Sequence, residues 1–262
     1  MNIYIATKYL QYILFSSHKR GHRIHSPFVF NLVTKVFRNK IKPEVVFKIE
    51  KIRQMMLSDN SRINVTDYGS GSLRIRSNLR SISAIAKYST VPRKYGLLLA
   101  GLSGEFGKSD IVELGTSLGI SALYMASGSP EATVHTIEGC LETSDIAKNN
   151  FEKAGLKNIK SYAGKFDEVL PEIANQQIRP GFTFIDGDHR KEPLLRYFYK
   201  ISEMSADESV IAIDDIHYSN EMSEAWEEIK QFKRVTLTID IFRMGLVFFK
   251  KGMTRSDYII RY

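Results

Sequence analysis

Residues 111–119 read Ile-Val-Glu-Leu-Gly-Thr-Ser-Leu-Gly, and the apolar stretch Ile120–Ser127 follows directly. The pattern predicts a buried strand that ends in a glycine turn and opens a helix. Glycine lets the backbone approach a bound molecule closely, and the first turn of a helix offers unpaired N–H groups. The turn therefore predicts a cofactor-binding loop, although a plain tight connection between strand and helix would have the same pattern.

The next predicted strand ends in an acidic residue. The apolar stretch Ala132–Ile137 runs directly into Glu138, which follows Glu113 by 25 residues. In nucleotide-binding α/β folds, a carboxylate at this place binds the ribose hydroxyls of the cofactor. The two strand–turn–helix units together favour an adenosine-containing cofactor.

The composition is that of an ordinary globular chain. Of the 262 residues, 43% are hydrophobic and 25% are charged, which is enough for a full α/β core. The single cysteine, Cys140, excludes an internal disulfide framework and a cysteine-rich zinc site, and it suits a reducing compartment. Because there is no membrane-length apolar run and no secretion-type cleavage site, we expect a cytoplasmic protein.

The net charge of +8 is unevenly distributed. Residues 1–110 hold 19 lysines and arginines against 6 acidic residues, whereas residues 111–262 hold 18 against 23. A basic first half could contact nucleic acid, an anionic lipid surface or an acidic substrate, or it could be a solvated basic face. It contains no RNA-binding signature, so nucleic acid is an unlikely partner that the sequence does not exclude.

Hydrophobic spacing divides the chain into two parts. Residues 3–58 are predicted to be largely helical, and residues 1–88 are expected to form a helical N-terminal extension or cap. From residue 91 onward, helices alternate with short apolar strands, which is typical of a parallel sheet built from βα units.

The expected strands of this second part lie at 110–114, 132–137, 158–162, 181–186 and 208–214. The expected helices lie at 93–105, 119–127, 142–154, 165–176, 190–204 and 219–232. Residues 235–241 and 244–249 should form an antiparallel hairpin that closes one edge of the sheet.

Two segments within residues 1–88 allow several interpretations. His18, His22 and His25 lie within eight residues and could bind a metal, but helix-breaking residues between them favour a structured turn. Residues 65–72 form a second glycine turn, and a basic stretch expected to be helical follows at 74–88. No strand with a terminal acid follows that turn, so it predicts a lid, a substrate clamp or a surface loop rather than the cofactor site.

Acidic residues gather after two later strands. Asp186 and Asp188 follow one strand, and Asp214 and Asp215 follow the next. The carboxyl ends of parallel strands meet at the ligand-binding edge of the sheet, so these side chains should lie close together. Asp186, Asp214 and Asp215 could bind a magnesium- or calcium-like ion through oxygen ligands. Alternatively, Asp188 and Asp215 cap the helices that follow them.

These motifs occur in the order seen in a known family. ELGTSLG, the acid of TIEG, KAGLKNIKSYAGKFDEVLPEI, FIDGDH and IAIDDIH resemble the class I S-adenosylmethionine-dependent methyltransferases. The segment from 89 to 250 is most similar to cation-dependent O-methyltransferases of the catechol and caffeoyl-CoA type, and HRIHSPFVF and DYGSGS resemble segments of uncharacterised bacterial methyltransferases. The resemblance implies a Rossmann-like α/β fold, with a mostly parallel sheet and a terminal antiparallel hairpin, in a methyltransferase domain at 89–262.

The resemblance also implies roles for individual positions. The expected cofactor contacts are Glu113, Gly115, Thr116, Ser117, Gly119, Glu138, Gly139, Lys165, Phe166 and Asp186. Within this set, Gly115, Ser117 and Gly119 would cradle the methionine part, and Glu138 would bind the ribose. Asp186, Asp214 and Asp215 fall on the metal triad, although the relatives usually carry an amide at position 215.

The implied mechanism is direct transfer of the sulfonium methyl group to a substrate oxygen. His189 stands where catechol-type enzymes hold a lysine, and as a neutral imidazole near Asp186 it could accept the hydroxyl proton. A divalent cation would assist by lowering the pKa of that hydroxyl. His189 or His217 could instead bind the metal or have a structural role.

We therefore expect O-methylation of a small hydroxylated metabolite by an S-adenosylmethionine-dependent enzyme, with Mg²⁺ or another divalent cation as a second cofactor. The N-terminal extension would cap the active site and select the substrate, or it would form a homodimer contact. The alternatives are methylation of RNA or protein, and binding of S-adenosylmethionine without catalysis.

Overall fold

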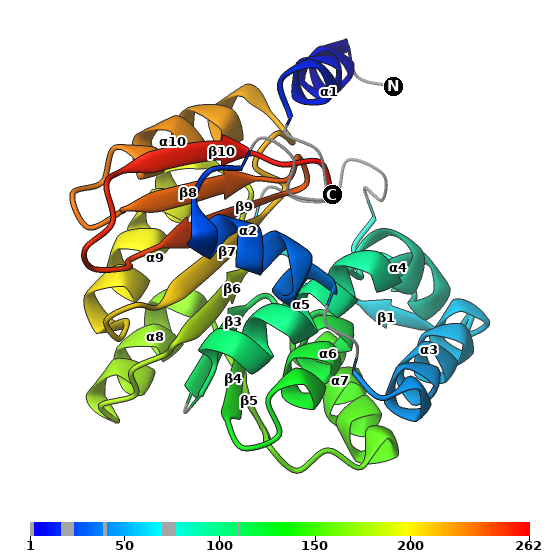
Figure 1. Cartoon of the computed structure of the whole chain (residues 1–262). Helices are drawn as coiled ribbons and strands as arrows, with labels where there is room; N and C mark the ends of the chain where they lie inside the picture. Colours follow the sequence, from blue (N-terminus) through cyan, green and yellow to red (C-terminus); the bar gives the residue numbers. More distant parts are fainter. Residues whose placement is uncertain (1–2, 17–23, 39–40, 70–76, 109) are drawn as a thin grey trace.

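The computed structural model of the chain describes all residues except 1–2, 17–23, 39–40, 70–76 and 109. Its described part is built around an eight-stranded sheet with helices on both faces (Figure 1). The strand order across the sheet is β10-β8-β9-β7-β6-β3-β4-β5.

Five neighbouring strands of the sheet, β7, β6, β3, β4 and β5, are parallel to one another. Strands β8 and β9 form the predicted antiparallel hairpin. The strands are β3 (Asp110–Leu114), β4 (Thr133–Glu138), β5 (Ile159–Ala163), β6 (Phe182–Ile185), β7 (Val210–Asp214), β8 (Leu237–Asp240), β9 (Met244–Phe248) and β10 (Ser256–Ile259). Strand β9 is antiparallel to both of its neighbours, β7 and β8. The predicted parallel strands and the hairpin are confirmed, with bounds that differ by at most two residues.

The edge of the sheet differs from the prediction. The hairpin β8–β9 does not close it, because β10 adds to β8 in parallel and forms the edge strand. Four residues long and only partly buried, β10 lacks the continuous apolar run that marked the central strands. Its place is therefore decided by pairing with β8 rather than by a local signal.

Helices cover both faces of the sheet. The helices α5 (Arg93–Phe106), α6 (Ile120–Gly128) and α7 (Leu141–Ala154) lie on one face, and α8 (Phe166–Asn175), α9 (Lys191–Met204) and α10 (Asn220–Lys230) lie on the other (Figure 1). Neighbouring strand residues enter opposite cores: Ile111 packs in the core of α5 and α6, and Val112 in that of α8 to α10. Burial on both faces explains why these strands read as continuous apolar runs.

The N-terminal part shares a core with the sheet. Its elements are α1 (Ile3–Phe15), α2 (Pro27–Thr34), η1 (Val36–Arg38), α3 (Pro43–Leu57), β1 (Arg62–Asn64), β2 (Leu79–Ser81) and α4 (Ile82–Tyr88). Val29 and Leu32 of α2 belong to the same hydrophobic cluster as α5 and α6. The Tyr12 hydroxyl of α1 donates a hydrogen bond to the carbonyl oxygen of Ile260 at 2.8 Å, so α1 rests on the C-terminal segment.

The helix expected at 74–88 is only partly present. Residues 79–81 pair with β1 as a short antiparallel strand, and α4 begins at Ile82, where Ser81 accepts a hydrogen bond from the backbone N–H of Ala84. A serine cap and a cross-strand partner together outweigh the helical spacing here. His18, His22, Gly71, Arg74 and Arg76 lie outside the described residues. No described helix has the length and apolar character to cross a membrane.

Candidate active site

The glycine turn between β3 and α6 has the close packing that its sequence predicts. Gly115 has φ +99°, and a Cβ atom there would lie 2.1 Å from the backbone oxygen of Asp186. Gly119 has φ +84° and stands at the N-terminal cap of α6. Only a residue without a side chain lets the ends of β3 and β6 meet in this way.

Glu138 joins this turn from the end of β4. Its carboxylate accepts hydrogen bonds from the backbone N–H groups of Ser117, at 2.7 Å, and Cys140, at 2.9 Å. Burial raises the pKa of Glu138, and these two hydrogen bonds oppose the rise. The carboxylate is thus held beside the turn, at the position expected to bind the ribose.

Glu113 lies beneath the turn rather than on its surface. The residue is fully buried, and its Oε2 accepts a hydrogen bond from the Thr136 hydroxyl, which also lies against the Thr116 hydroxyl. Its Oε1 is buried without a hydrogen-bond partner among the described residues. Burial raises the pKa of this carboxyl to about 7. A buried acceptor without a donor is costly, so an ammonium group placed at the turn would suit it.

The segment 89–91 forms the opposite wall of a narrow cleft at the turn. The cleft is lined by Ser89, Thr90, Val91, Gly115, Thr116, Ser117, Ile120, Ser121 and Asp186. Arg53 of α3 holds this wall, because its guanidinium donates to the Thr90 hydroxyl at 2.6 Å and to the Val91 carbonyl at 2.7 Å. The N-terminal part therefore positions one side of the predicted cofactor cradle.

An aromatic side chain from the 65–69 segment lies on the predicted adenosine side. The Tyr68 ring contacts the backbone at Gly139, where a Cβ atom would be 2.7 Å from the ring. The Lys165 Nζ lies 5.2 Å from the centroid of the same ring. The Phe166 ring lies against the backbone at Gly187 and packs edge-on against Tyr197, with ring centroids 5.3 Å apart.

The three acidic residues of the predicted metal triad do meet at the ends of β6 and β7. Burial raises the pKa of Asp186 well above its usual value and that of Asp215 to about 6, and the charge of Asp214 adds to both shifts. Asp214 is the deepest of the three, with a fully buried side chain. Such a cluster needs a compensating positive charge.

The compensating positive charge is that of Arg243, in the turn between β8 and β9. The guanidinium of Arg243 donates to Oδ1 of Asp214 at 3.0 Å through Nε and to Oδ2 at 2.7 Å through Nη2. Both carboxylate oxygens of Asp214 are therefore bound by an arginine. Across the described residues, no group of three or more His, Cys, Asp or Glu side chains is arranged to hold a metal ion. The residues present do not fit the divalent-cation site that the sequence predicts, because a guanidinium compensates the acidic cluster instead.

The capping alternative is wrong. Ser219, not Asp215, caps α10, with its hydroxyl accepting from the backbone N–H of Met222 at 3.1 Å. Asp188 forms an ion pair with Arg190 at 2.6 Å, and α9 has no side-chain cap.

The two histidines after these strands have different surroundings. His189 Nε2 lies 3.7 Å from Oδ1 of Asp186, and about a quarter of its side chain is exposed. His217 is held on both sides, with Nε2 at 2.7 Å from Asp240 and Nδ1 at 3.2 Å from Ser223. Both ring nitrogens of His217 are thus engaged by side chains, whereas His189 keeps an accessible imidazole next to Asp186.

Part of this arrangement is similar to known proteins. Residues 112–216, from β3 to just beyond β7, match the family model of a methyltransferase domain. This segment is therefore similar to a methyltransferase domain. The matched segment includes the glycine turn, Glu138, Asp186 and the end of β7, but it stops short of Arg243.

Curated relatives of this chain are named O-methyltransferases. The chain is 32% identical over 116 residues to the O-methyltransferase imqG of Aspergillus flavus, which covers 42% of this chain and 46% of that protein. It is 30% identical over 110 residues to the catechol O-methyltransferase of Niastella koreensis, covering 41% of this chain and 49% of that protein. The chain spans about half the length of the curated relatives it matches.

Solved structures share the fold over a larger part of the chain. An O-methyltransferase from Bacillus cereus in complex with SAH has a TM-score of 0.56 at 22% identity, covering 79% of this chain and 90% of that chain. TomG from Streptomyces achromogenes, an O-methyltransferase in complex with SAM, has a TM-score of 0.56 at 15% identity, covering 79% and 89%. The likeness confirms the predicted Rossmann-like α/β fold with a mostly parallel sheet.

Three residues near this site were not found from the sequence. Arg243, Arg53 and Tyr68 each reach it from an element far away in the chain. Arg243 and Arg53 belong to no motif. Tyr68 belongs to the DYGSGS turn, which predicted a lid, a substrate clamp or a surface loop rather than a cofactor contact. The roles of the predicted cofactor contacts stay predictions, because geometry alone does not test what they bind.

Proposed function

We propose that the chain is an S-adenosylmethionine-dependent O-methyltransferase that acts on a small hydroxylated metabolite. The observation that carries the proposal is the arrangement of the β3–α6 turn, where Gly115 packs on Asp186 and Glu138 binds the Ser117 N–H. The similarity to named O-methyltransferases supports the reaction class.

The cofactor, when bound, supplies an electrophilic methyl group on a sulfonium. In this proposal Glu138 binds the ribose hydroxyls, and Lys165 and Tyr68 border the adenine. The unpartnered Oε1 of Glu113 accepts from the ammonium of the methionine part, which gives this buried oxygen its missing donor. The cleft bordered by residues 89–91 is narrow, which limits the positions that the methyl group can take.

His189 is the proposed base for the acceptor hydroxyl. Its Nε2 takes the proton, and the nearby Asp186 carboxylate stabilises the imidazolium that forms. Arg243 donates to both carboxylate oxygens of Asp214 and so compensates the acidic cluster where a metal ion would otherwise do so. We therefore propose that turnover does not depend on a divalent cation, in contrast to the expectation from the sequence.

The test is calorimetric titration with S-adenosylmethionine, followed by a methyl-transfer assay on a panel of catechols, each with Mg²⁺ and with EDTA. We expect cofactor binding and turnover that are equal under both conditions. Glu138→Gln should weaken cofactor binding by about tenfold or more, whereas Glu142→Gln, an exposed change nearby on α7, should not.

Two results would contradict parts of the proposal. Absence of cofactor binding would refute the methyltransferase function as a whole. Binding without turnover on any acceptor, in both wild type and His189→Gln, would favour the alternative of a non-catalytic binding module. A cytoplasmic location and a homodimer stay predictions from the sequence.

A further inference from the structure

The narrow cleft at the glycine turn has one wall, residues 89–91, that comes from outside the parallel sheet. This wall leads directly into α5, which begins at Arg93. Arg53 binds the wall through the Thr90 hydroxyl and the carbonyl oxygen of Val91. Only 9% of the Arg53 side chain is exposed, so this buried cation needs an anion that holds it in place.

Glu50, one turn earlier on α3, is that anion. Its two carboxylate oxygens accept from Nε of Arg53 at 3.1 and 3.2 Å. The nitrogens that bind the wall are the other two, Nη1 and Nη2. Because the guanidinium is planar and rigid, a carboxylate that fixes Nε also fixes the direction in which Nη1 and Nη2 donate. Glu50 therefore orients the contact between Arg53 and the wall.

The same carboxylate is bound from the opposite side of the cleft. The Tyr124 hydroxyl of α6 donates to Oε1 of Glu50 at 2.8 Å. Tyr124 is fully buried and lies one turn after Ile120 and Ser121, which line the cleft. Burial and the hydrogen bond to Glu50 both raise the pKa of Tyr124, so its phenol stays protonated and remains a donor. Glu50 is thus connected to both sides of the cleft.

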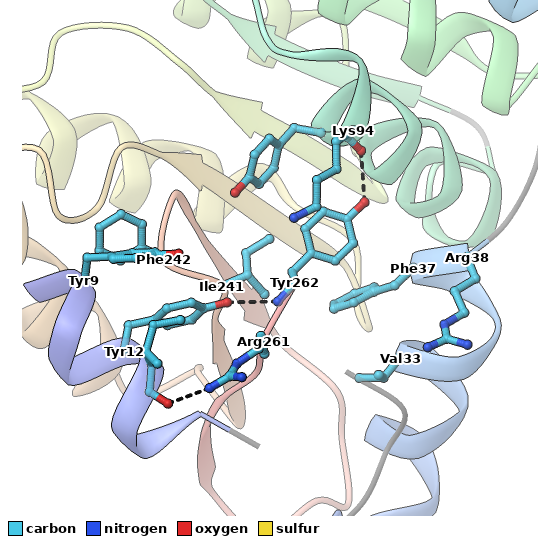
Figure 2. A pocket seen from close by; sticks show the side chains of 12 residues that line it. Tyr9, Tyr12, Val33, Phe37, Arg38, Lys94, Ile241, Phe242, Arg261 and Tyr262 are labelled. Atoms are coloured by element: carbon cyan, nitrogen blue, oxygen red, sulfur yellow. Dashed lines mark hydrogen bonds between the residues drawn. The ribbon is translucent and has the colours of Figure 1, made fainter. Parts of the chain in front are cut away.

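The start of α5 packs on the same tyrosine. A Cβ atom at Gly96 would lie 2.4 Å from the Tyr124 ring. From another direction, the Tyr262 hydroxyl donates to the carbonyl oxygen of Lys94 at 2.9 Å, a hydrogen bond that Figure 2 shows. The start of α5 is therefore held on two sides, and the position of residues 89–91 depends on the contacts from α3.

We propose that Glu50 is a positioning residue for the methyl donor, because it connects the two sides of the cleft and so sets the width of the cleft. Glu50 does not line the cleft, and it acts through Arg53 and Tyr124. It also lies outside residues 112–216, the segment that matches the family model. This inference rests on the proposed methyltransferase function and makes the N-terminal part a determinant of cofactor affinity.

Calorimetric titration of the full chain with S-adenosylmethionine tests this role. Glu50→Ala should raise the Kd about tenfold, because Arg53 loses its charge partner. Tyr124→Phe removes one hydroxyl and keeps the ring that packs on Gly96, so it should raise the Kd about fivefold. Glu50→Gln should give a Kd between those of the wild type and Glu50→Ala, since the amide oxygen still accepts one of the hydrogen bonds.

A double variant and two controls separate positioning from stability. Glu50→Ala combined with Tyr124→Phe should raise the Kd no further than Glu50→Ala alone, because both changes remove the same contact. Glu44→Gln, exposed on α3, should keep the wild-type Kd, and so should Tyr199→Phe, which breaks a tyrosine–glutamate hydrogen bond between α9 and α10. A purely structural role would lower the unfolding temperature and the number of binding sites per chain, but the remaining folded chains would bind with the wild-type Kd.

The outcomes distinguish this inference from the proposed function. Binding in the wild type with an unchanged Kd in Glu50→Ala and Tyr124→Phe would overturn the inference and leave the function standing. Additive losses in the double variant would overturn it as well, since the two residues would then act independently. Absence of binding in the wild type would refute the proposed function and this inference together.

Discussion

Replacing Arg243 by methionine would keep much of the side-chain length and remove the positive charge at the acidic cluster. Asp214, whose side chain is fully buried, would then lose the guanidinium that holds it at 2.7 to 3.2 Å. Removing one partner of a buried ion pair typically costs about 3–5 kcal/mol. Because 29% of the Arg243 side chain is exposed, solvent screens part of this effect. We expect the free energy of unfolding to fall by about 2–4 kcal/mol at pH 7.

Urea unfolding followed by tryptophan fluorescence measures this change. The single tryptophan, Trp226, is buried in α10 and packs against Gly245, two residues beyond Arg243. Adding Asp214→Asn to Arg243→Met should recover a large part of the lost stability, because the unpaired charge is then removed. Arg243→Lys should give an intermediate loss, since it keeps the charge but not the bidentate geometry.

The effect of divalent cations on stability is a more specific test of the role of Arg243 than the loss of stability alone. In Arg243→Met, Asp186, Asp214 and Asp215 are left as three oxygen donors without a guanidinium, so Mg²⁺ should stabilise this variant. The wild-type protein should be indifferent to Mg²⁺ and to EDTA. Wild-type stability or methyl transfer that rises with Mg²⁺ and is lost in EDTA would refute the role given to Arg243. A stability loss below about 1 kcal/mol in Arg243→Met would refute it as well, since that is the level of an exposed pair.

Three further predictions concern the cradle. Gly115→Ala should lower the free energy of unfolding by about 2–4 kcal/mol and abolish cofactor binding in calorimetry, because the new Cβ atom would lie 2.1 Å from a backbone oxygen. Gly252 also has a positive φ but has open space around it, so Gly252→Ala should lower the free energy of unfolding by only about 1 kcal/mol. Arg53→Ala should weaken cofactor binding about tenfold by releasing the 89–91 wall, whereas Lys51→Ala, exposed on the same helix, should leave the measured Kd unchanged. Burial raises the pKa of Glu113 from 4.5 to about 7, so the folded state binds the proton more tightly and stability should fall as pH rises from 4.5 to 7. Glu113→Gln should flatten this fall in urea unfolding across that range, and an unchanged slope would contradict the shift.

The strands and helices of the central sheet could be predicted because their signals are local. Strands buried on both faces read as continuous apolar runs, and the turns between them carry glycines or acids at fixed places, as in Gly115 and Glu138. Strand β10 and the short strand at 79–81 lack such runs, and only their pairing partners define them. Their absence from the prediction therefore reflects a missing local signal.

The sequence by itself determined the fold class, the glycine turn and the gathering of acids at one edge of the sheet. Parallel strands end at the same edge, so the order of motifs along the chain is enough to bring Asp186 and Asp214 together. Only the tertiary structure decided which group compensates the negative charge of those carboxylates. Arg243 follows Asp214 by 29 residues and reaches it because β9 pairs antiparallel with β7. Strand pairing brings Arg243 to Asp214, and no sequence motif or spacing predicts that contact. The folded structure was therefore needed to show a guanidinium at the place where the motifs predicted a metal ion.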